Sequence, residues 1–301
     1  MNKNKNITIV VASDNFFAVM IGALLKSIDV NHTSGEHIDF YIIDDGISTK
    51  FRQQLERIAD PSRITLKWFK SKEIVPSNIN IPLDKSSFPV TVFLRIFIPY
   101  MIDQDVEKVI YIDVDTIVQD DISNLWNIDL KDYTIGAVQD YCKTVDCRWS
   151  GIPNYKQLGL AGDTKYFNSG VLLINPKKWR KQDITNQVID VLTKYKEHVV
   201  MPDQYGLNVV FVNKWLELDP KWNWFANLEN DNPSLVHFVE IKPIFSTYIF
   251  NEIYRQEFFR YLSMTPWKNF TPISGYRRLQ KKMVTKIKKK LLAFNIFSFI
   301  P

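Results

Sequence analysis

Cysteine and glycine are scarce in this chain, and each scarcity excludes a class of protein. The 301 residues include 2 cysteines, Cys142 and Cys147, which match no metal-ligand pattern and are too few for a disulfide framework. We therefore expect a protein of a reducing compartment. With 10 glycines, 46% apolar and 24% charged residues, the chain is neither collagen-like nor low-complexity nor disordered.

Long apolar runs are missing as well. The first apolar run, residues 7–12, is too short for the core of a signal peptide with its cleavage site. Every other run is also shorter than the roughly 20 residues that cross a bilayer. We expect a cytoplasmic protein whose contact with a membrane is peripheral, on the inner face of the cell membrane.

The positive charge is confined to one end. The chain has 38 Lys and Arg against 33 Asp and Glu. Eight of these cations follow residue 276 without a single acid: Arg277, Arg278, Lys281, Lys282, Lys286, Lys288, Lys289 and Lys290. The rest of the chain is therefore slightly acidic, and we expect no nucleic-acid partner for it.

Apolar runs that end in polar residues alternate with segments of helical spacing. The pattern predicts strands at 7–12, 38–43, 64–69, 108–115, 134–139, 167–175 and 234–239. It predicts helices around 19–28, 49–58, 184–195, 203–211 and 251–262, and one that carries Arg95 and stops near Pro99. Residues 71–90 are expected to form an irregular segment that runs over the sheet. Residues 141–166 are expected to form a loop region or lid. The alternation is typical of an α/β fold with its sites at the carboxyl ends of strands.

Two carboxylates stand at the end of one predicted strand. Asp113 and Asp115 follow four apolar residues, and residues i and i+2 of an extended chain point to the same side. Two hard oxygen ligands there favour a divalent cation that bridges diphosphate oxygens. The alternative is that both acids only solvate the end of the strand.

Six motifs in order along residues 6–245 resemble those of the family 8 glycosyltransferases, the retaining nucleotide-sugar transferases of GT-A fold related to bacterial lipooligosaccharide galactosyltransferases. The motifs are residues 12–14, Arg95 within 93–96, 109–115, 167–175, 202–204, and His237-Phe238 followed by Lys242-Pro243. The resemblance implies a mixed, mostly parallel central sheet flanked by helices. We expect a catalytic domain at 1–250 and a C-terminal helical segment at 251–301.

The same resemblance implies the ligands of the site. Asp113, Asp115 and His237 would hold Mn²⁺, with Mg²⁺ as the alternative. His237 has a plainer interpretation, as an ordinary strand histidine. Ala12 and Asp14 would meet the uracil and the ribose, and Phe17 could stack on the base. The other contacts to the nucleotide sugar would come from Arg95, Asp113, Val114, Asp115, Asp140, Asn168, Asp203, Gln204 and Lys242.

Several of these residues also have structural interpretations. Asp14 could cap the following helix, Arg95 could pair with an acid, and Asp203 could begin a helix after Pro202. The chain also departs from the family pattern in two places. Residues 15–17 read Asn-Phe-Phe, and the stretch after His237 is one residue short, has no glycine and contains Glu240.

The implied function is transfer of glucose or galactose from a UDP-sugar to a hydroxyl of a membrane-borne glycan, such as a lipopolysaccharide or other cell-surface saccharide. Asp203, Gln204 and Arg95 are the expected catalytic residues. Retention requires either a carboxylate nucleophile or same-face attack assisted by the leaving phosphate, and we favour the latter. The alternative function is a catalytically weak nucleotide-sugar-binding protein or a UDP-sugar hydrolase.

The basic C-terminus has helical periodicity. Its apolar residues form one stripe: Leu279, Met283, Ile287, Leu291 and Phe294, with Phe297, Phe299 and Ile300 at the end. This pattern predicts a basic amphipathic helix that lies on an anionic membrane surface. The alternative is a stripe that packs on the catalytic body.

Overall fold

The structure is a computed structural model that describes residues 6–76, 79, 81–82, 88–229 and 232–297, with side chains of the last helix described to residue 291. A seven-stranded sheet forms its centre, in the order β3-β2-β1-β4-β7-β6-β8. Its strands are β1 (Ile7–Asp14), β2 (Ile38–Asp45), β3 (Ile64–Lys70), β4 (Val109–Ile112), β6 (Ile135–Thr144), β7 (Lys165–Ile174) and β8 (Leu216–Glu217). Only the β4–β7 and β6–β7 pairs are antiparallel, so the expected mixed, mostly parallel sheet is confirmed.

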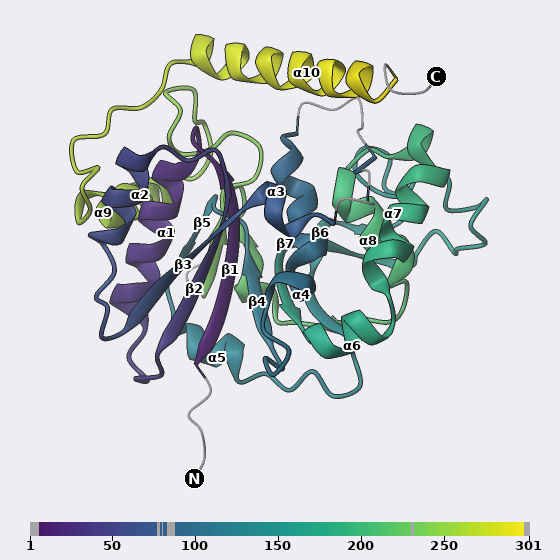
Figure 1. Ribbon diagram of the computed structural model, residues 1–301, viewed down its shortest axis with the longest axis horizontal. Coiled ribbons are helices and arrows are strands. Elements are labelled where there is room, and N and C mark those ends of the chain that lie inside the picture. The colour runs from purple at the N-terminus through teal and green to yellow at the C-terminus, as the bar shows by residue number, and fades with distance from the viewer. Residues whose placement is uncertain (1–5, 77–78, 80, 83–87, 230–231, 298–301) are drawn as a thin grey trace.

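Helices cover both faces of this sheet (Figure 1). On one side lie α1 (Ala18–Asn31), α2 (Thr49–Glu56) and α9 (Glu252–Ser263). On the other lie the 3₁₀ helix η1 (Val90–Phe97), α4 (Ile98–Met101), α6 (Pro176–Lys181), α7 (Ile184–Lys194) and α8 (Pro202–Val210). The short elements α3 (Ser71–Ile74), α5 (Ile122–Trp126), η2 (Lys196–His198) and η3 (Pro220–Asn223) connect them. Strand β1 is buried on both faces, because Ile9 and Val11 belong to one apolar cluster and Val10 and Ala12 to the other.

A second, three-stranded sheet was not foreseen. It consists of β5 (Thr116–Val118), β10 (Leu235–His237) and β9 (Trp224–Phe225), with β10 in the middle. Strand β10 runs antiparallel to β5, and His237 lies opposite Thr116. The small sheet thereby brings the histidine beside the end of β4.

One expectation about local structure is wrong. Asp113 and Asp115 do not lie on one extended strand, since β4 ends at Ile112 and the chain turns before β5. The Thr116 hydroxyl closes this turn by donating to the Asp113 carbonyl at 2.8 Å.

The helix expected to carry Arg95 and to stop near Pro99 is confirmed as the 3₁₀ helix η1, which ends at Phe97. Pro99 itself stands in the first turn of the next helix, α4, where proline is well tolerated.

Residues 145–164 contain no helix or strand, so the loop expected at 141–166 is confirmed for most of its length. Strand β6 continues to Thr144, and Val145 and Ile152 beyond it are buried. Cys142 and Cys147 form a disulfide at the start of this segment, a pairing that the sequence did not predict and that does not fit the expected reducing compartment.

The C-terminal segment divides into two parts. Helix α9 buries Tyr254, Phe258 and Tyr261 in the core cluster that also contains α1. Helix α10 (Gly275–Phe297) crosses above the sheet edge at which β1 ends (Figure 1). A division of the chain at residue 250 stays a prediction. Among the described residues, no helix is both long and apolar enough to cross a bilayer.

Candidate active site

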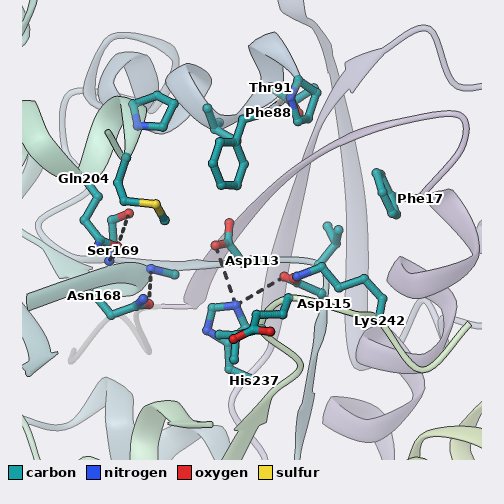
Figure 2. A pocket seen from close by; sticks show the side chains of 18 of the residues that line it. Phe17, Phe88, Thr91, Asp113, Asp115, Asn168, Ser169, Gln204, His237 and Lys242 are labelled. Atoms are coloured by element: carbon teal, nitrogen blue, oxygen red, sulfur yellow. Dashed lines mark hydrogen bonds and ion pairs between the residues drawn. The ribbon is translucent and has the colours of Figure 1, made fainter. Parts of the chain in front are cut away.

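A pocket of about 580 Å³ lies at the carboxyl ends of β1 and β4. Every residue expected to bind the metal or the nucleotide sugar lines it: Ala12, Asp14, Phe17, Arg95, Asp113, Val114, Asp115, Asp140, Asn168, Asp203, Gln204, His237 and Lys242. Residues far apart in the sequence therefore meet in one cavity. Figure 2 shows Phe17 and Lys242 on one side of the metal-ligand candidates, and Asn168, Ser169 and Gln204 on the other.

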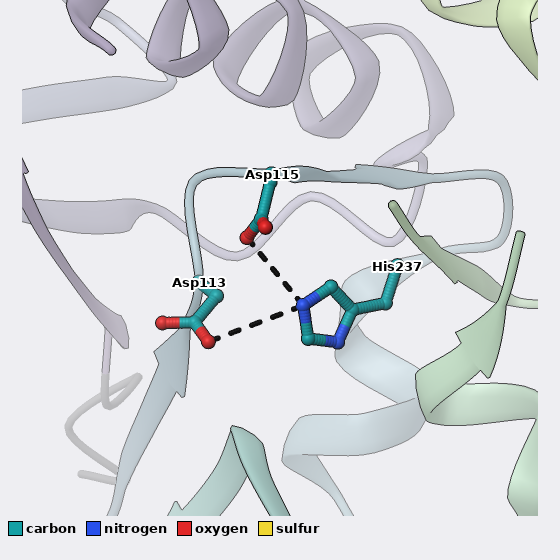
Figure 3. Close-up of side chains that lie close together, drawn as sticks. All are labelled: Asp113, Asp115 and His237. Carbon is teal, nitrogen blue, oxygen red and sulfur yellow. Dashed lines mark ion pairs between the residues drawn. The ribbon is translucent and has the colours of Figure 1, made fainter. Parts of the chain in front are cut away.

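Asp113, Asp115 and His237 form a group that could hold a metal ion (Figure 3). His237 Nε2 lies 3.4 Å from Asp115 Oδ1 and 4.0 Å from Asp113 Oδ2. Two backbone hydrogen bonds fix the turn between the acids: Asp113 N donates to Gly170 O at 2.7 Å, and Phe238 N donates to Asp115 O at 2.8 Å. The two carboxylates therefore meet at the histidine because the chain turns between them. The sequence had predicted the same convergence from the alternation of side chains along an extended strand.

A chain of amides orients the imidazole. Asn223 Nδ2 and Gly170 N both donate to Asn168 Oδ1, each at 2.9 Å, which leaves Asn223 Oδ1 as an acceptor 2.9 Å from His237 Nδ1. His237 Nδ1 must then carry the proton, so the lone pair of Nε2 points toward the two carboxylates. This is the tautomer that binds a metal through Nε2.

Lys242 supplies the positive charge nearest to this group. Its ammonium pairs with Asp115 and donates to Phe238 O at 2.8 Å. Burial alone would raise the pKa of Asp115, but the charge of Lys242 and its hydrogen bond to the carboxylate outweigh burial and hold that pKa well below its usual range. Asp115 is therefore an ionised ligand at neutral pH. A contact of Lys242 with phosphate stays a prediction.

Arg95 joins the two halves of the site. It is 3% exposed, and it donates from Nη2 to Asp113 Oδ1 and pairs through Nε with Asp203 Oδ2, both at 3.0 Å. Burial would lower its pKa, but Asp113 and Asp203 raise it above the ordinary value. The expectation that Arg95 pairs with an acid is confirmed, and its partners are acids of the site itself. A direct contact with sugar or diphosphate stays a prediction.

A buried polar network lines the end of the pocket beyond Arg95. Ser169 N donates to Gln204 Oε1, and the Ser169 hydroxyl donates to Asp203 Oδ2, both at 3.0 Å. Asp140 Oδ2 accepts from Asn168 Nδ2 at 2.8 Å and from Gln204 Nε2 at 3.2 Å. Asp203 also stands in the first turn of α8, next to Pro202, as its structural interpretation predicted. Burial raises the pKa of Asp203, and Arg95 opposes that rise.

Asp14 has both of its carboxylate oxygens engaged. Oδ1 accepts from Phe16 N at 2.9 Å and from Phe17 N at 3.2 Å, within the turn that precedes α1. The N-cap residue of α1 is Phe17 and has no side-chain cap, so the interpretation of Asp14 as a helix cap is wrong. Oδ2 pairs with Lys281 of α10. Arg278 of α10 stacks 5.6 Å from the Phe245 ring centroid. The basic helix thus supplies part of the pocket wall beside Asp14.

Four residues of this site were missed in the sequence. Ser169 and Asn223 hydrogen-bond site residues that are distant in the sequence, so no motif in their own part of the chain identifies them. Tyr111, whose hydroxyl donates to Asp113 Oδ1 at 2.7 Å, follows the alternation of β4 two residues before the acid. Lys281 was recognised only as one cation of the tail.

Replacing Gly170 by alanine tests how closely the histidine is held. A Cβ there would overlap the His237 ring and lie 2.9 Å from Asn168 Oδ1. We expect Gly170→Ala to weaken Mn²⁺ binding at least tenfold, as outer contacts of a metal site typically do, measured by electron paramagnetic resonance of free Mn²⁺. The isosteric Asp115→Asn should weaken it further, with circular dichroism showing that both variants fold. Unchanged Mn²⁺ affinity in both variants would remove the metal assignment.

Comparison with known proteins places this site in a family. Residues 8–244 match the family described as glycosyl transferase family 8. General stress protein A of Bacillus subtilis (strain 168) is 30% identical over 291 residues, which cover 89% of this chain and 96% of that protein. Lipopolysaccharide 1,2-glucosyltransferase of Escherichia coli (strain K12) is 22% identical over 244 residues, covering 79% of this chain and 68% of that protein.

Other relatives are longer than this chain. Glycosyltransferase GlyA of Streptococcus pneumoniae serotype 4 is 31% identical over 77% of this chain, but the match spans 31% of that protein. Among solved structures, the galactosyltransferase LgtC in complex with donor and acceptor sugar analogs has a TM-score of 0.70 and 26% identity, covering 86% of this chain and 96% of that one. The chain therefore belongs to glycosyltransferase family 8 and has the GT-A fold.

Proposed function

We propose that this glycosyltransferase moves a hexose, glucose or galactose, from a UDP-sugar to a hydroxyl of a membrane-borne glycan, with retention and with the help of Mn²⁺ or Mg²⁺. The observation that carries the proposal is the group of Asp113, Asp115 and His237, whose Nε2 lone pair faces two carboxylates in a pocket. The donor and acceptor analogs bound to the related LgtC support a two-substrate reaction. A lipopolysaccharide or another cell-surface saccharide is the proposed acceptor, in line with the named activity of the Escherichia coli relative.

The donor set fits a hard divalent cation. Two carboxylate oxygens provide anionic ligands, and the neutral imidazole is a normal third ligand. A cation bound there would supply positive charge to offset that of the departing diphosphate. Lys242 would leave Asp115 for a phosphate oxygen, since the ammonium and a metal compete for the same carboxylate. Arg95 would hold the Asp113 carboxylate in position through the hydrogen bond to Oδ1.

The proposed donor lies along the length of the pocket. The uridine would occupy the end formed by Ala12, Asp14, Phe17 and Val114, where Lys281 must release Asp14 for the ribose. The hexose would lie toward Asp140, Asn168, Asp203 and Gln204. In that pose the diphosphate passes over the metal-ligand candidates, between the two ends that Figure 2 shows.

Same-face attack is the mechanism that these contacts favour. Asp203, the nearest candidate nucleophile, has Oδ2 bound by Arg95 at 3.0 Å and by the Ser169 hydroxyl at 3.0 Å. A carboxylate with these two contacts is held in place as a negative charge and is a poor nucleophile. Gln204, the next residue, is also a poor nucleophile. The residues would therefore act by positioning and electrostatics, while the leaving phosphate receives the proton of the acceptor hydroxyl.

Binding of the donor is the first test. At a hundredfold excess over Kd, a ligand stabilises the folded state by about 2.7 kcal/mol, which raises the Tm by several degrees. We expect UDP-glucose or UDP-galactose to give such a shift with Mn²⁺, and Asp115→Asn to lose the part that depends on Mn²⁺. If none of the UDP-sugars raises the Tm, the proposed function is wrong. UDP release that needs no acceptor would identify a hydrolase instead.

The mechanism is tested by looking for a sugar on the protein. We expect the denatured enzyme to carry no hexose, by intact-mass measurement, after incubation with the UDP-sugar and Mn²⁺ but without acceptor. A hexose ester on Asp203 would establish double displacement, and a hexosyl tyrosine would establish self-glycosylation. Transfer at an undiminished rate by Asp203→Asn would independently exclude Asp203 as the nucleophile.

The C-terminal helix carries the membrane part of the proposal. Its apolar stripe faces away from the body, with Leu279, Met283, Ile287 and Leu291 exposed by 60%, 64%, 53% and 59%. Its inward face consists of polar residues, among which Thr285 and Lys289 are buried. The alternative that the stripe packs on the body is therefore wrong for these four residues. Phe294, Phe297, Phe299 and Ile300 lie outside the described side chains. An outward apolar stripe on an acid-free helix suits the interface of an anionic membrane on the cytoplasmic side.

Acidic substitutions on the outer face test this part without disturbing the pocket. We expect Met283→Glu with Ile287→Glu to abolish binding to phosphatidylglycerol vesicles, because each change removes apolar burial and opposes the lipid charge. Ile253→Glu on α9, at a residue that is 70% exposed, is the matched control and should bind normally. Truncation after Tyr276 should also abolish binding. Wild-type affinity in the double variant would contradict membrane docking through this stripe.

A further inference from the structure

The pocket continues beyond the polar network into an aromatic end that the proposed donor does not use. Tyr141 and Trp149 line it and are 51% and 60% exposed, unusually large fractions for side chains of this size. Their ring centroids lie 6.1 Å apart with an interplanar angle of 56°. Two neighbouring aromatic rings thus present their surfaces to one side of a pocket that is otherwise rich in charge.

The aromatic pair stands on a fixed frame. Tyr141 directly follows Asp140, whose carboxylate accepts from Asn168, Gln204 and, at 2.8 Å, from Cys142 N. The Cys142–Cys147 disulfide closes the segment between the two rings. Gly151 N donates to Cys147 O at 3.0 Å, and a Cβ at Gly151 would lie 2.7 Å from the same carbonyl. The exposed rings therefore have a set position relative to Asp140.

A polar group beside the pair lacks a partner. Ser150 lines the same pocket, is 4% exposed, and its hydroxyl finds no hydrogen-bond partner in the part of the chain that the structure describes. Buried hydroxyls are normally satisfied, so an unsatisfied one at a pocket wall is a place for a ligand hydroxyl. An aromatic face next to an available hydroxyl matches a pyranose ring, which has an apolar C–H face and a polar rim.

The position of the pair selects the acceptor rather than the donor. Tyr141 adjoins Asp140, which hydrogen-bonds Asn168 and Gln204, and Figure 2 shows these two on the opposite side of the metal-ligand candidates from Phe17. The nucleotide end has its own aromatic residue in Phe17 and its own cation in Lys281. A ring stacked on Tyr141 and Trp149 would lie beside the proposed hexose and away from the uridine end, so the acceptor is its natural occupant.

We propose that Tyr141 and Trp149 form a stacking platform for a neutral pyranose ring of the acceptor glycan, with Ser150 as a hydrogen-bonding partner at its edge. The inference rests on the proposed transferase function, and it adds the residues that would hold the acceptor: two aromatic rings that the proposed donor does not contact. Stacking on aromatic faces contributes about 0.5–1.5 kcal/mol per pair, or up to about tenfold in affinity.

The test measures sugar binding and donor binding separately. The probes are the methyl glycosides of glucose, galactose and N-acetylglucosamine, together with lactose and maltose, followed by saturation-transfer NMR in the presence of UDP and Mn²⁺. We expect at least one probe to bind the wild-type protein, and Trp149→Ala and Tyr141→Ala each to raise its Kd about five- to tenfold. Tyr141→Phe retains the ring and should retain the affinity. Tyr133→Ala, at a residue 37% exposed outside the pocket lining, is the matched control.

The remaining outcomes are distinct. In all four variants, the thermal shift with a UDP-sugar and Mn²⁺ should equal that of the wild type. Loss of that shift in Trp149→Ala would assign the pair to the donor and overturn the inference. Wild-type sugar affinity in both alanine variants would also overturn it, as would the failure of every probe to bind the wild-type protein. If no UDP-sugar binds even the wild-type protein, the proposed function fails, whatever the probes do.

Discussion

A buried guanidinium holds this active site together. Arg95 comes from a 3₁₀ helix, Asp113 from the turn after β4 and Asp203 from the start of α8, so one side chain connects three elements of separate origin. Arg95 makes two further contacts: it donates to the Ser169 carbonyl, and its guanidinium lies 4.5 Å from the centroid of the Tyr111 ring. Removing one member of a buried ion pair costs about 3–5 kcal/mol. Without Arg95, Asp113 and Asp203 would face one another with no cation between them.

The pairing divides the acids of the pocket into two kinds. Asp203 lies behind the guanidinium and serves the network of Ser169 and Gln204, whereas Asp113 and Asp115 keep oxygens directed at His237. Arg95 engages Oδ1 of Asp113 and Lys242 pairs with Oδ2 of Asp115, so Oδ2 of Asp113 and Oδ1 of Asp115 are the oxygens that face His237. An anionic ligand such as a diphosphate can then approach, since a metal ion and Lys242 would offset the charge of the two aspartates.

The sequence predicted those features that depend on short stretches of chain. Apolar runs located the long strands of the central sheet and β10, but not the short strands β5, β8 and β9. The order of the motifs brought Asp113, Asp115 and His237 together before any geometry was known. The turn between the two acids could not be predicted, because it depends on hydrogen bonds to Gly170 and Phe238 from distant strands. The engagement of Asp14 Oδ2 likewise required the position of a helix more than 250 residues away. Long-range contacts decided what local pattern left open.

Helix α10 shows how such a contact changes the meaning of a pattern. Its periodicity predicts an amphipathic helix equally well whichever face packs inward. Contacts at the carboxyl edge of the sheet determine which face of α10 packs inward. Lys281 pairs with Asp14 and lies over the ring of Phe16, and Arg278 lies over the ring of Phe245. Cations on the inside force the apolar stripe to the outside. The net positive charge of the chain thus belongs to a helix whose inward cations meet the acidic and aromatic side chains at the mouth of the pocket, and this same packing leaves the apolar stripe exposed.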